Sequence, residues 1–256
     1  MKASEFVSEF ASHGLAAWEA KVYDAIIHGE GLDFSLYDVP VATRDGKHKG
    51  TFQTTGDYLT IGEPGDTMRM PLTPGMAQKV ADYYGMLLPT SRMVDAIWNA
   101  APVKLEPHPM VPNKYVNLPQ FLEHSRIVDE QLSGFEPTLT AGQKKDVIVA
   151  KTMPPSKVII YGWHRPNGEP IQDRTPVHRA DYLDYSHGIR LVGPMMEVNG
   201  RTMKTTDVLR DPELSKLISD QGPVDVPRYG GPLKPGQRGF QIVQGWGDAL
   251  FSSRVP

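Results

Sequence analysis

Proline and glycine interrupt this chain so often that it can form only short helices and strands. The 256 residues include 23 prolines and 24 glycines. Proline lacks the N–H that helix and sheet interiors need, and glycine favours turns. Hydrophobic residues still make up 39% of the chain, which is enough for a core. The sequence therefore predicts a globular, loop-rich fold built from many short elements.

Hydrophobic spacing predicts an α+β fold with an N-terminal helix, an antiparallel meander, a helical middle and a mostly β C-terminal part. The N-terminal helical pattern runs from Ser4 to Gly29, with a break at Gly14. The strands of the meander are expected at residues 36–42, 51–55, 58–61 and 68–72. Helices are expected at 74–84, at 90–100 and from Asn117, whose side chain suits an N-cap. Later strands are expected at 146–150, 158–163, 188–192 and 195–198, and Asp211-Pro212 predicts the start of a last helix.

We expect residues 1–256 to form a single domain. Prolines at 102, 107, 109 and 112 make the segment 102–116 a stiff crossover and the one place for a subdivision. Neither half of the chain shows a complete set of core elements, which favours one domain over two.

The composition excludes several classes of function. The chain has no cysteine, so disulfides, thiolate metal sites and cysteine nucleophiles are ruled out. Its formal charge of -3 argues against nucleic acid as a partner. No apolar run approaches the roughly 20 residues of a transmembrane helix, and the first residues lack a signal-peptide pattern. Because cysteine-free chains are common among exported bacterial proteins, we expect a secreted protein, extracellular or periplasmic.

A polar segment between apolar strands, residues 164–190, is the strongest candidate for a functional site. Three of the eight histidines fall in it. The candidate catalytic residues are His164, Tyr185, His187 and Arg190. The candidate substrate-binding residues, in the segment or beside it, are Trp163, His178, Asp184 and Ser186. The alternative is a solvated polar loop held by its own salt bridges.

The stretch Ser186-His187-Gly188-Ile189-Arg190, with His164 and Gly168 upstream, resembles the active-site motif of L,D-transpeptidases. That family remodels peptidoglycan on a mainly β catalytic fold, through a histidine, a Ser/Thr-His-Gly-Cys stretch and an arginine. The resemblance implies that His164 corresponds to the upstream histidine, His187 to the central one and Arg190 to the arginine. Ile189 stands where the family has its cysteine nucleophile, and one residue fewer precedes the arginine. The acyl-enzyme chemistry of that family therefore cannot run in this chain. The full-length pattern otherwise resembles bacterial proteins.

The residues themselves favour acid/base catalysis by His187. Successive strand residues point to opposite faces, so Tyr185 and His187 share one face, and Ser186 and Arg190 share the other. His187 is therefore expected to pair with Tyr185, or with a group from another segment. A Tyr185/His187 pair suits proton abstraction beside a carboxylate, as in polysaccharide lyases, as well as it suits hydrolysis.

Three basic positions have competing interpretations. Arg190 is expected to be buried and paired, either with an internal carboxylate such as Asp146 or Asp184 or with an anionic substrate group. Lys144-Lys145 is expected to be the solvated start of a strand; the alternative is a positive site for an acidic substrate. His124 is expected at the edge of a helix, bonded to a neighbour; the alternative is that it points into a cleft.

Two other functions stay open beside acid/base catalysis. Zinc could be bound by His178, Asp184 and His187, with His164 as a fourth ligand or as the base. A non-catalytic module could hold a glycan or peptide with the same polar loop. The expected function is that of a hydrolase or lyase that cleaves or transfers bonds in a cell-wall or extracellular polymer, polysaccharide or peptidoglycan. We expect no cofactor, zinc being the exception considered, and a polymeric or anionic substrate as the partner.

Overall fold

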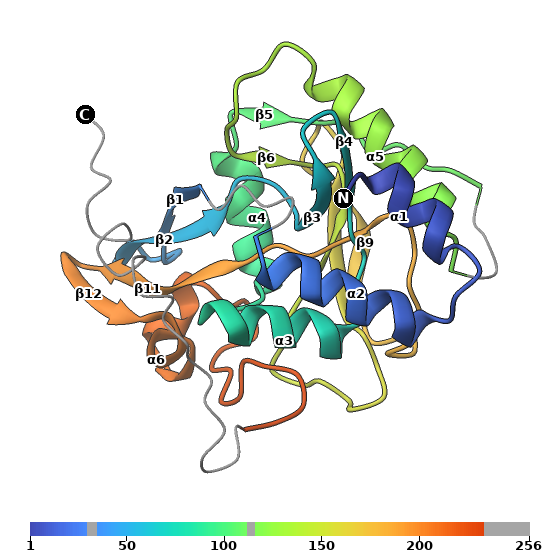
Figure 1. Ribbon diagram of the computed structural model, residues 1–256. Helices are drawn as coiled ribbons and strands as arrows, with labels where there is room; N and C mark the ends of the chain where they lie inside the picture. Colours follow the sequence, from blue (N-terminus) through green and yellow to red (C-terminus); the bar gives the residue numbers. More distant parts are fainter. Residues whose placement is uncertain (30–34, 112–115, 233–256) are drawn as a thin grey trace.

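The computed structural model describes residues 1–29, 35–111 and 116–232. It has the α+β fold that the sequence predicts, with helices and mainly antiparallel strands. Within the described residues, two four-stranded sheets form the framework, and helices pack around them (Figure 1). Two large clusters of buried apolar side chains, one beside each sheet, make up most of the core.

Three helices in the first third of the chain contribute to one core cluster. α1 (Ala3–Phe10) and α2 (Leu15–Ile27) are separated at Gly14, the N-cap of α2, where the helical pattern of the sequence breaks. α3 (Pro74–Tyr84) has the predicted bounds and begins after Thr73, whose hydroxyl caps its first turn. The helix signals in this part of the sequence are therefore confirmed.

The first sheet is antiparallel throughout, with the strand order β1-β2-β11-β12. Its strands are β1 (Leu36–Ala42), β2 (Lys49–Thr55), β11 (Val192–Val198) and β12 (Arg201–Lys204). The turn between β1 and β2 contains Gly46 at a φ of 69°, a conformation that glycine adopts without strain. α4 (Ser91–Ala100) and α6 (Thr205–Arg210) pack against this sheet.

The second sheet carries many of the candidate site residues and has the strand order β10-β7-β8-β9. Its strands are β7 (Lys145–Val147), β8 (Ile160–His164), β9 (Pro170–Thr175) and β10 (His187–Gly188). β10 runs parallel to β7, and the other pairs are antiparallel. Lys145 is paired with His187 on one side and with Gly162 on the other. α4 also packs against β8, so this helix lies between the two sheets.

The predicted meander is two separate hairpins in the structure. β1 and β2 belong to the first sheet, whereas β3 (Thr60–Glu63) pairs with β4 (Asp66–Arg69) in a two-stranded sheet. The chain cannot continue from β2 into a neighbouring β3, because the free edge of β2 is occupied by β11.

The helix predicted from Asp211-Pro212 is wrong. α6 ends at Arg210, and a single 3-10 turn follows at Leu214–Leu217. The Asp211 carboxylate does cap this turn, accepting the N–H groups of residues 213 and 214 at 2.8 Å. After the turn the chain folds back onto α6, where the N–H of Val224 bonds to the carbonyl of Leu209.

The described part of the proline-rich segment contacts neighbouring elements. β5 (Val103–Lys104) pairs in parallel with β6 (Thr140–Ala141). Val103 also joins a small apolar cluster with Val128 of α5 (Leu118–Leu132). Asn117 caps α5 as predicted, accepting the N–H of Gln120 at 3.1 Å.

Candidate functional site

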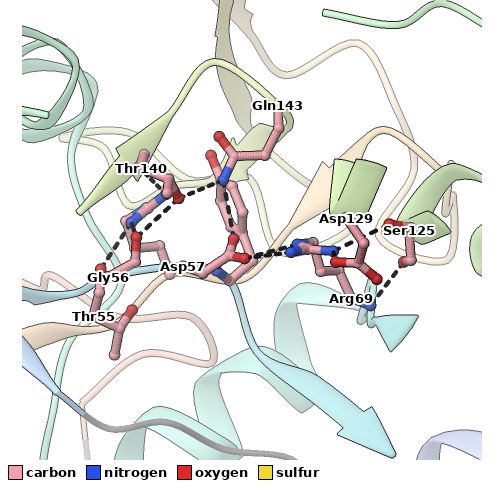
Figure 2. A network of polar contacts seen from close by, with 10 residues as sticks. Thr55, Gly56, Asp57, Arg69, Ser125, Asp129, Thr140 and Gln143 are labelled. Atoms are coloured by element: carbon pink, nitrogen blue, oxygen red, sulfur yellow. Dashed lines mark hydrogen bonds and ion pairs between the residues drawn. The ribbon is translucent and has the colours of Figure 1, made fainter. Parts of the chain in front are cut away.

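A network of polar contacts runs from β4 and α5 to the loop before β7 (Figure 2). Arg69, Ser125 and Gln143 are buried, whereas the carboxylates of Asp57 and Asp129 are partly exposed. Arg69 is 3% exposed and lies 2.6 Å from Asp57 and 2.8 Å from Asp129. Ser125 accepts two further hydrogen bonds from Arg69. Burial alone would raise the pKa of Asp57, but the charge of Arg69 lowers it below its usual range. Gln143 extends the network by donating to Asp57 at 3.0 Å.

Arg190, a candidate catalytic residue, lies in the interior beside this network and is 1% exposed. Its terminal nitrogens donate at 2.8 to 3.1 Å to the carbonyl oxygens of Thr55, Gly56 and Thr140. Its Nε lies 3.7 Å from Asp146, one of the two internal carboxylates expected from the sequence. Its guanidinium carbon lies 4.3 Å from the ring centre of Tyr58. These contacts make Arg190 a link between separate backbone segments.

Asp146 is a buried carboxylate with an elevated pKa. The hydroxyl of Tyr58 donates to one of its oxygens at 2.9 Å. Burial raises the pKa of Asp146 to about 6, although the charge of Arg190 opposes the shift. Asp146 is therefore ionised at neutral pH and balances the buried guanidinium.

Tyr185 and His187 do not form the pair that strand alternation predicts. The Tyr185 hydroxyl accepts the N–H of Met110 at 2.6 Å and donates to its carbonyl at 3.0 Å. The Tyr185 ring lies 5.0 Å from the ring of His124, whereas the ring of His187 lies 5.6 Å from that of Tyr182. The hydroxyl of Tyr185 thus attaches the proline-rich segment to the second sheet.

Several candidate substrate-binding residues lie around Tyr182. Its ring stacks on His178, with centres 4.2 Å apart, and its hydroxyl donates to Asp184 at 3.0 Å. The other oxygen of Asp184 accepts the N–H and the hydroxyl of Ser186. Burial would raise the pKa of Asp184, but the Ser186 hydrogen bonds and the nearby His187 lower it. The structure therefore brings His178, Asp184 and Ser186 together.

His187 lies beneath this group and is completely buried. In the part of the chain that the structure describes, neither of its ring nitrogens has a hydrogen-bond partner. Burial lowers the pKa of His187 to about 3, so the ring is neutral at pH 7. The candidate Trp163 is also buried, with Lys145 Nζ 4.9 Å above its ring and its indole N–H unpaired among the described residues. No carboxylate hydrogen bond orients the imidazole of His187.

His164 lies in a different polar cluster, between β8 and α4. Its Nε2 is 3.1 Å from Oδ1 of Asp95, and the hydroxyl of Tyr161 donates to the same oxygen at 2.9 Å. The imidazole stacks on the indole of Trp98, with centres 5.4 Å apart and an interplanar angle of 15°. The side chain of His164 is 4% exposed, whereas that of Asp95 is 47% exposed. The histidine is held by packing, and its carboxylate partner faces solvent.

The contact with Asp95 sets which nitrogen of His164 is basic. Because the carboxylate accepts a hydrogen bond from Nε2, the neutral ring carries its proton there, and Nδ1 has the free lone pair. Gly162 lies beside that edge of the ring at a φ of 101°. A Cβ at Gly162 would lie 3.4 Å from Nδ1 of His164 and 3.1 Å from a methyl group of Val94. Burial and the Asp95 carboxylate raise the pKa of Tyr161, so its hydroxyl stays protonated.

An ion pair flanks this cluster. Arg174 of β9 donates to Asp220 and, at 2.7 Å, to the hydroxyl of Ser91 at the start of α4. Ser91 in turn donates to Asp220 at 2.9 Å. The charges of Arg174 and Asp220 both act on Tyr161, which makes the two clusters neighbours. A cation, two carboxylates and an oriented histidine are thus close together.

Sequence reasoning found His164 but missed its partners. Asp95 lies 69 positions earlier, and its place in an amphipathic helix looks like an ordinary solvent-facing position. The one available signal was the spacing of Asp95 and Trp98, which are three residues apart and therefore neighbours on the helix surface. That spacing alone does not indicate which strand the pair will meet.

A cavity of about 710 Å³ lies elsewhere, on the first sheet. The β1–β2 hairpin and the β11–β12 turn line it, and its charged side chains are Lys47, Lys49 and Glu197. None of the candidate residues and no histidine line this cavity. We therefore base the candidate active site on the chemistry around His164 and not on cavity size.

Neither a metal site nor a membrane span emerges from the described ranges. Residues 1–29, 35–111 and 116–232 contain no group of three His, Asp or Glu side chains that could hold a metal ion, and His178, Asp184 and His187 form none. In the same ranges, no helix is long and apolar enough to cross a bilayer. Comparison with protein-family models, with curated proteins and with solved structures found no match.

Proposed function

We propose that this protein is an enzyme that cleaves or transfers bonds in a cell-envelope or extracellular polymer, with His164 as its general base. The observation that carries the proposal is the 3.1 Å contact between His164 Nε2 and Asp95 Oδ1. A histidine oriented by a carboxylate is a common arrangement for proton transfer in enzymes. The two side chains stand on a strand and a helix, which hold them more rigidly than loops would.

In the proposed mechanism, Nδ1 of His164 removes a proton from water or from a substrate carbon. Asp95 stabilises the imidazolium that forms, and the Tyr161 hydroxyl keeps the Asp95 oxygen in place. Deprotonated water attacks the scissile bond in hydrolysis, whereas a carbanion beside a carboxylate expels the leaving oxygen in elimination. In both cases the imidazolium returns its proton to the leaving group, which restores the base.

The partly exposed guanidinium of Arg174 is the feature that favours an anionic polymer as the substrate. The side chain of Arg174 is 28% exposed, and its guanidinium has more N–H groups than Ser91 and Asp220 use. Such a group can bind a carboxylate of the substrate near the histidine. The absence of cysteine is in keeping with an exported protein.

A non-catalytic module that binds a glycan or peptide is the second candidate. The observation that favours it is the cavity of about 710 Å³ on the first sheet, which has room for a ligand but lacks a histidine. This candidate predicts retention of the polymer without any product.

The test is an activity screen on insoluble peptidoglycan and on uronic-acid polysaccharides. Release of soluble fragments, new reducing ends and the ultraviolet absorbance of a new double bond distinguish hydrolysis from elimination. We expect His164→Ala and Asp95→Asn to lose at least about 100-fold in kcat/KM, because general base catalysis contributes roughly that much. Tyr161→Phe should lose less, since it keeps the base and its carboxylate.

The matched control is His28→Ala, which removes a largely exposed histidine directly after α2, paired with Asp24 of that helix and belonging to neither the His164 cluster nor the cavity. It should leave turnover unchanged, and all variants should unfold within a few degrees of the parent. Full activity in His164→Ala would overturn the assignment of the base. If the parent and His164→Ala both bind the polymer and neither releases a product, the protein is a binding module and not an enzyme.

A further inference from the structure

Lys144 is a buried amine without a carboxylate partner. It is 1% exposed, and its Nζ donates to the carbonyl of Tyr185 at 2.6 Å. In the described residues no carboxylate oxygen lies within 4.0 Å of Lys144, whereas Arg69 has two such partners and Arg190 has one. Buried charges are normally paired, because a lone charge away from water is strongly disfavoured. Asp57, Asp129 and Asp184 act on the amine from beyond contact distance, so within the described residues no carboxylate pairs with protonated Lys144 directly.

His124 lies beside the same tyrosine and is also unsatisfied. Its ring is completely buried, 5.0 Å from the ring of Tyr185. The backbone of His108 lies close enough to the ring to raise its pKa, but in the described part of the chain neither ring nitrogen meets the geometry of a hydrogen bond. Burial is the largest cause of the lowered pKa of His124, and the charge of Lys144 is the second largest, so the ring is neutral. A buried polar group without a partner calls for a ligand or an ordered water.

We propose that Lys144 and His124 form a buried binding site for one small monovalent anion, of the size of a halide or formate. The anion would supply the counter-charge that Lys144 lacks and accept a hydrogen bond from the imidazole N–H of His124. A water molecule could satisfy His124 but would leave the lysine charge uncompensated. A larger or divalent oxyanion does not suit a site with one amine and one neutral imidazole. This site is separate from the cluster around His164.

Anion binding at this site is coupled to proton uptake. Burial lowers the pKa of Lys144 to about 7, and a bound anion raises it again. Above pH 7 the anion therefore binds together with one proton. The other charged or titratable groups near Lys144 and His124 are Arg69, Asp57, Asp129, Asp184, His108 and His187. Arg69 forms ion pairs with Asp57 and Asp129 (Figure 2), and Asp184 accepts a hydrogen bond from Ser186. These groups are therefore already paired, and none of them takes the place of the anion.

The experiment measures thermal unfolding of the full chain at constant ionic strength while gluconate, a large anion, is replaced stepwise by chloride, and separately by formate. We expect the melting temperature of the parent to rise steadily with the logarithm of the chloride or formate concentration above its Kd, as for any ligand that binds the folded state. Calorimetric titration at pH 8 in two buffers of different ionisation enthalpy should show close to one proton taken up per anion.

Lys144→Met is the decisive variant, and Lys145→Met is its control. Methionine has a similar volume and removes the buried charge, so this variant should fold and lose the anion response. Lys145→Met removes the neighbouring lysine, whose Nζ lies over Trp163, and should keep the response. An equal melting temperature of the parent in chloride and gluconate would overturn the proposal. So would an anion response that persists in Lys144→Met, or binding to the parent without proton uptake at pH 8.

Discussion

Replacing Arg190 with lysine should cost more stability than almost any other charge-preserving substitution in this chain. The guanidinium is 1% exposed and reaches three carbonyl oxygens from two different segments, together with Asp146 and the ring of Tyr58. Lysine keeps the charge but not the planar fork, so its single amine cannot bind all of these partners at once.

The magnitude follows from the bonds that are lost. If the amine keeps one of the three carbonyls, two charge-assisted hydrogen bonds disappear, at about 1.5–3 kcal/mol each. The carbonyls left behind are buried, which adds to the loss. Arg190→Lys should therefore destabilise the protein by about 3–6 kcal/mol and lower the melting temperature by about 10 °C or more.

The assay is equilibrium unfolding in urea at pH 7, followed by tryptophan fluorescence and circular dichroism. The control is Arg179→Lys, whose side chain is 79% exposed and paired only with Asp181 two residues away; it should change stability by less than about 0.5 kcal/mol. If Arg190→Lys unfolds within about 1 kcal/mol of the parent, the interior contacts of Arg190 do not stabilise the fold as argued.

Three further predictions concern the ionisable groups of His187, Lys144 and Asp57. The pKa of His187 falls from about 6.5 in the unfolded chain to about 3 in the folded protein, so only the unfolded chain takes up its proton between these pH values. Stability should drop by up to about 1.4 kcal/mol per pH unit from pH 6.5 downwards, and His187→Leu should flatten the urea midpoint against pH in that window. The pKa of Lys144 is lowered to about 7, so in gluconate buffer stability should rise from pH 7 towards pH 10, and Lys144→Met should abolish the rise. Asp57→Asn leaves the buried Arg69 with Asp129 as its remaining carboxylate and should cost about 3 kcal/mol in urea unfolding, whereas a cost below that of Asp181→Asn would show that the pair is not stabilising.

Signals within a few residues predicted most of the helices and many strands. The bounds of β1 and α3 agree with the sequence, and Gly14 and Asn117 mark helix starts. These signals are local because a cap or a turn is completed by the backbone of its own neighbours. At Asp211 the local signal also holds, because the carboxylate caps the next turn as expected. The length of that turn was not predicted, and the chain beyond it returns to α6 through a bond from Val224 to Leu209.

Strand partners could not be derived in the same way. The second neighbour of β2 is β11, whose residues lie more than a hundred positions later, and not the adjacent β3. Both alternatives bury the same apolar faces, so hydrophobic alternation does not distinguish them. The finished sheet also packs against α4 and α6, which are remote in sequence from β2.

The sequence by itself determined the fold class, the residue types available for chemistry and the polar segment in which histidines gather. It could not determine which of those residues meet, because contacts such as His164 with Asp95 join positions far apart in the chain. Burial was decided by the tertiary structure as well: Lys144 and His124 were expected at the solvated start of a strand and at the edge of a helix, yet both are enclosed. Arg190 is buried as expected, but its carbonyl partners could not be predicted. The physical reason is that solvent access and pairing depend on what the rest of the chain packs against a side chain, and both set its pKa, its charge and the chemistry it can perform.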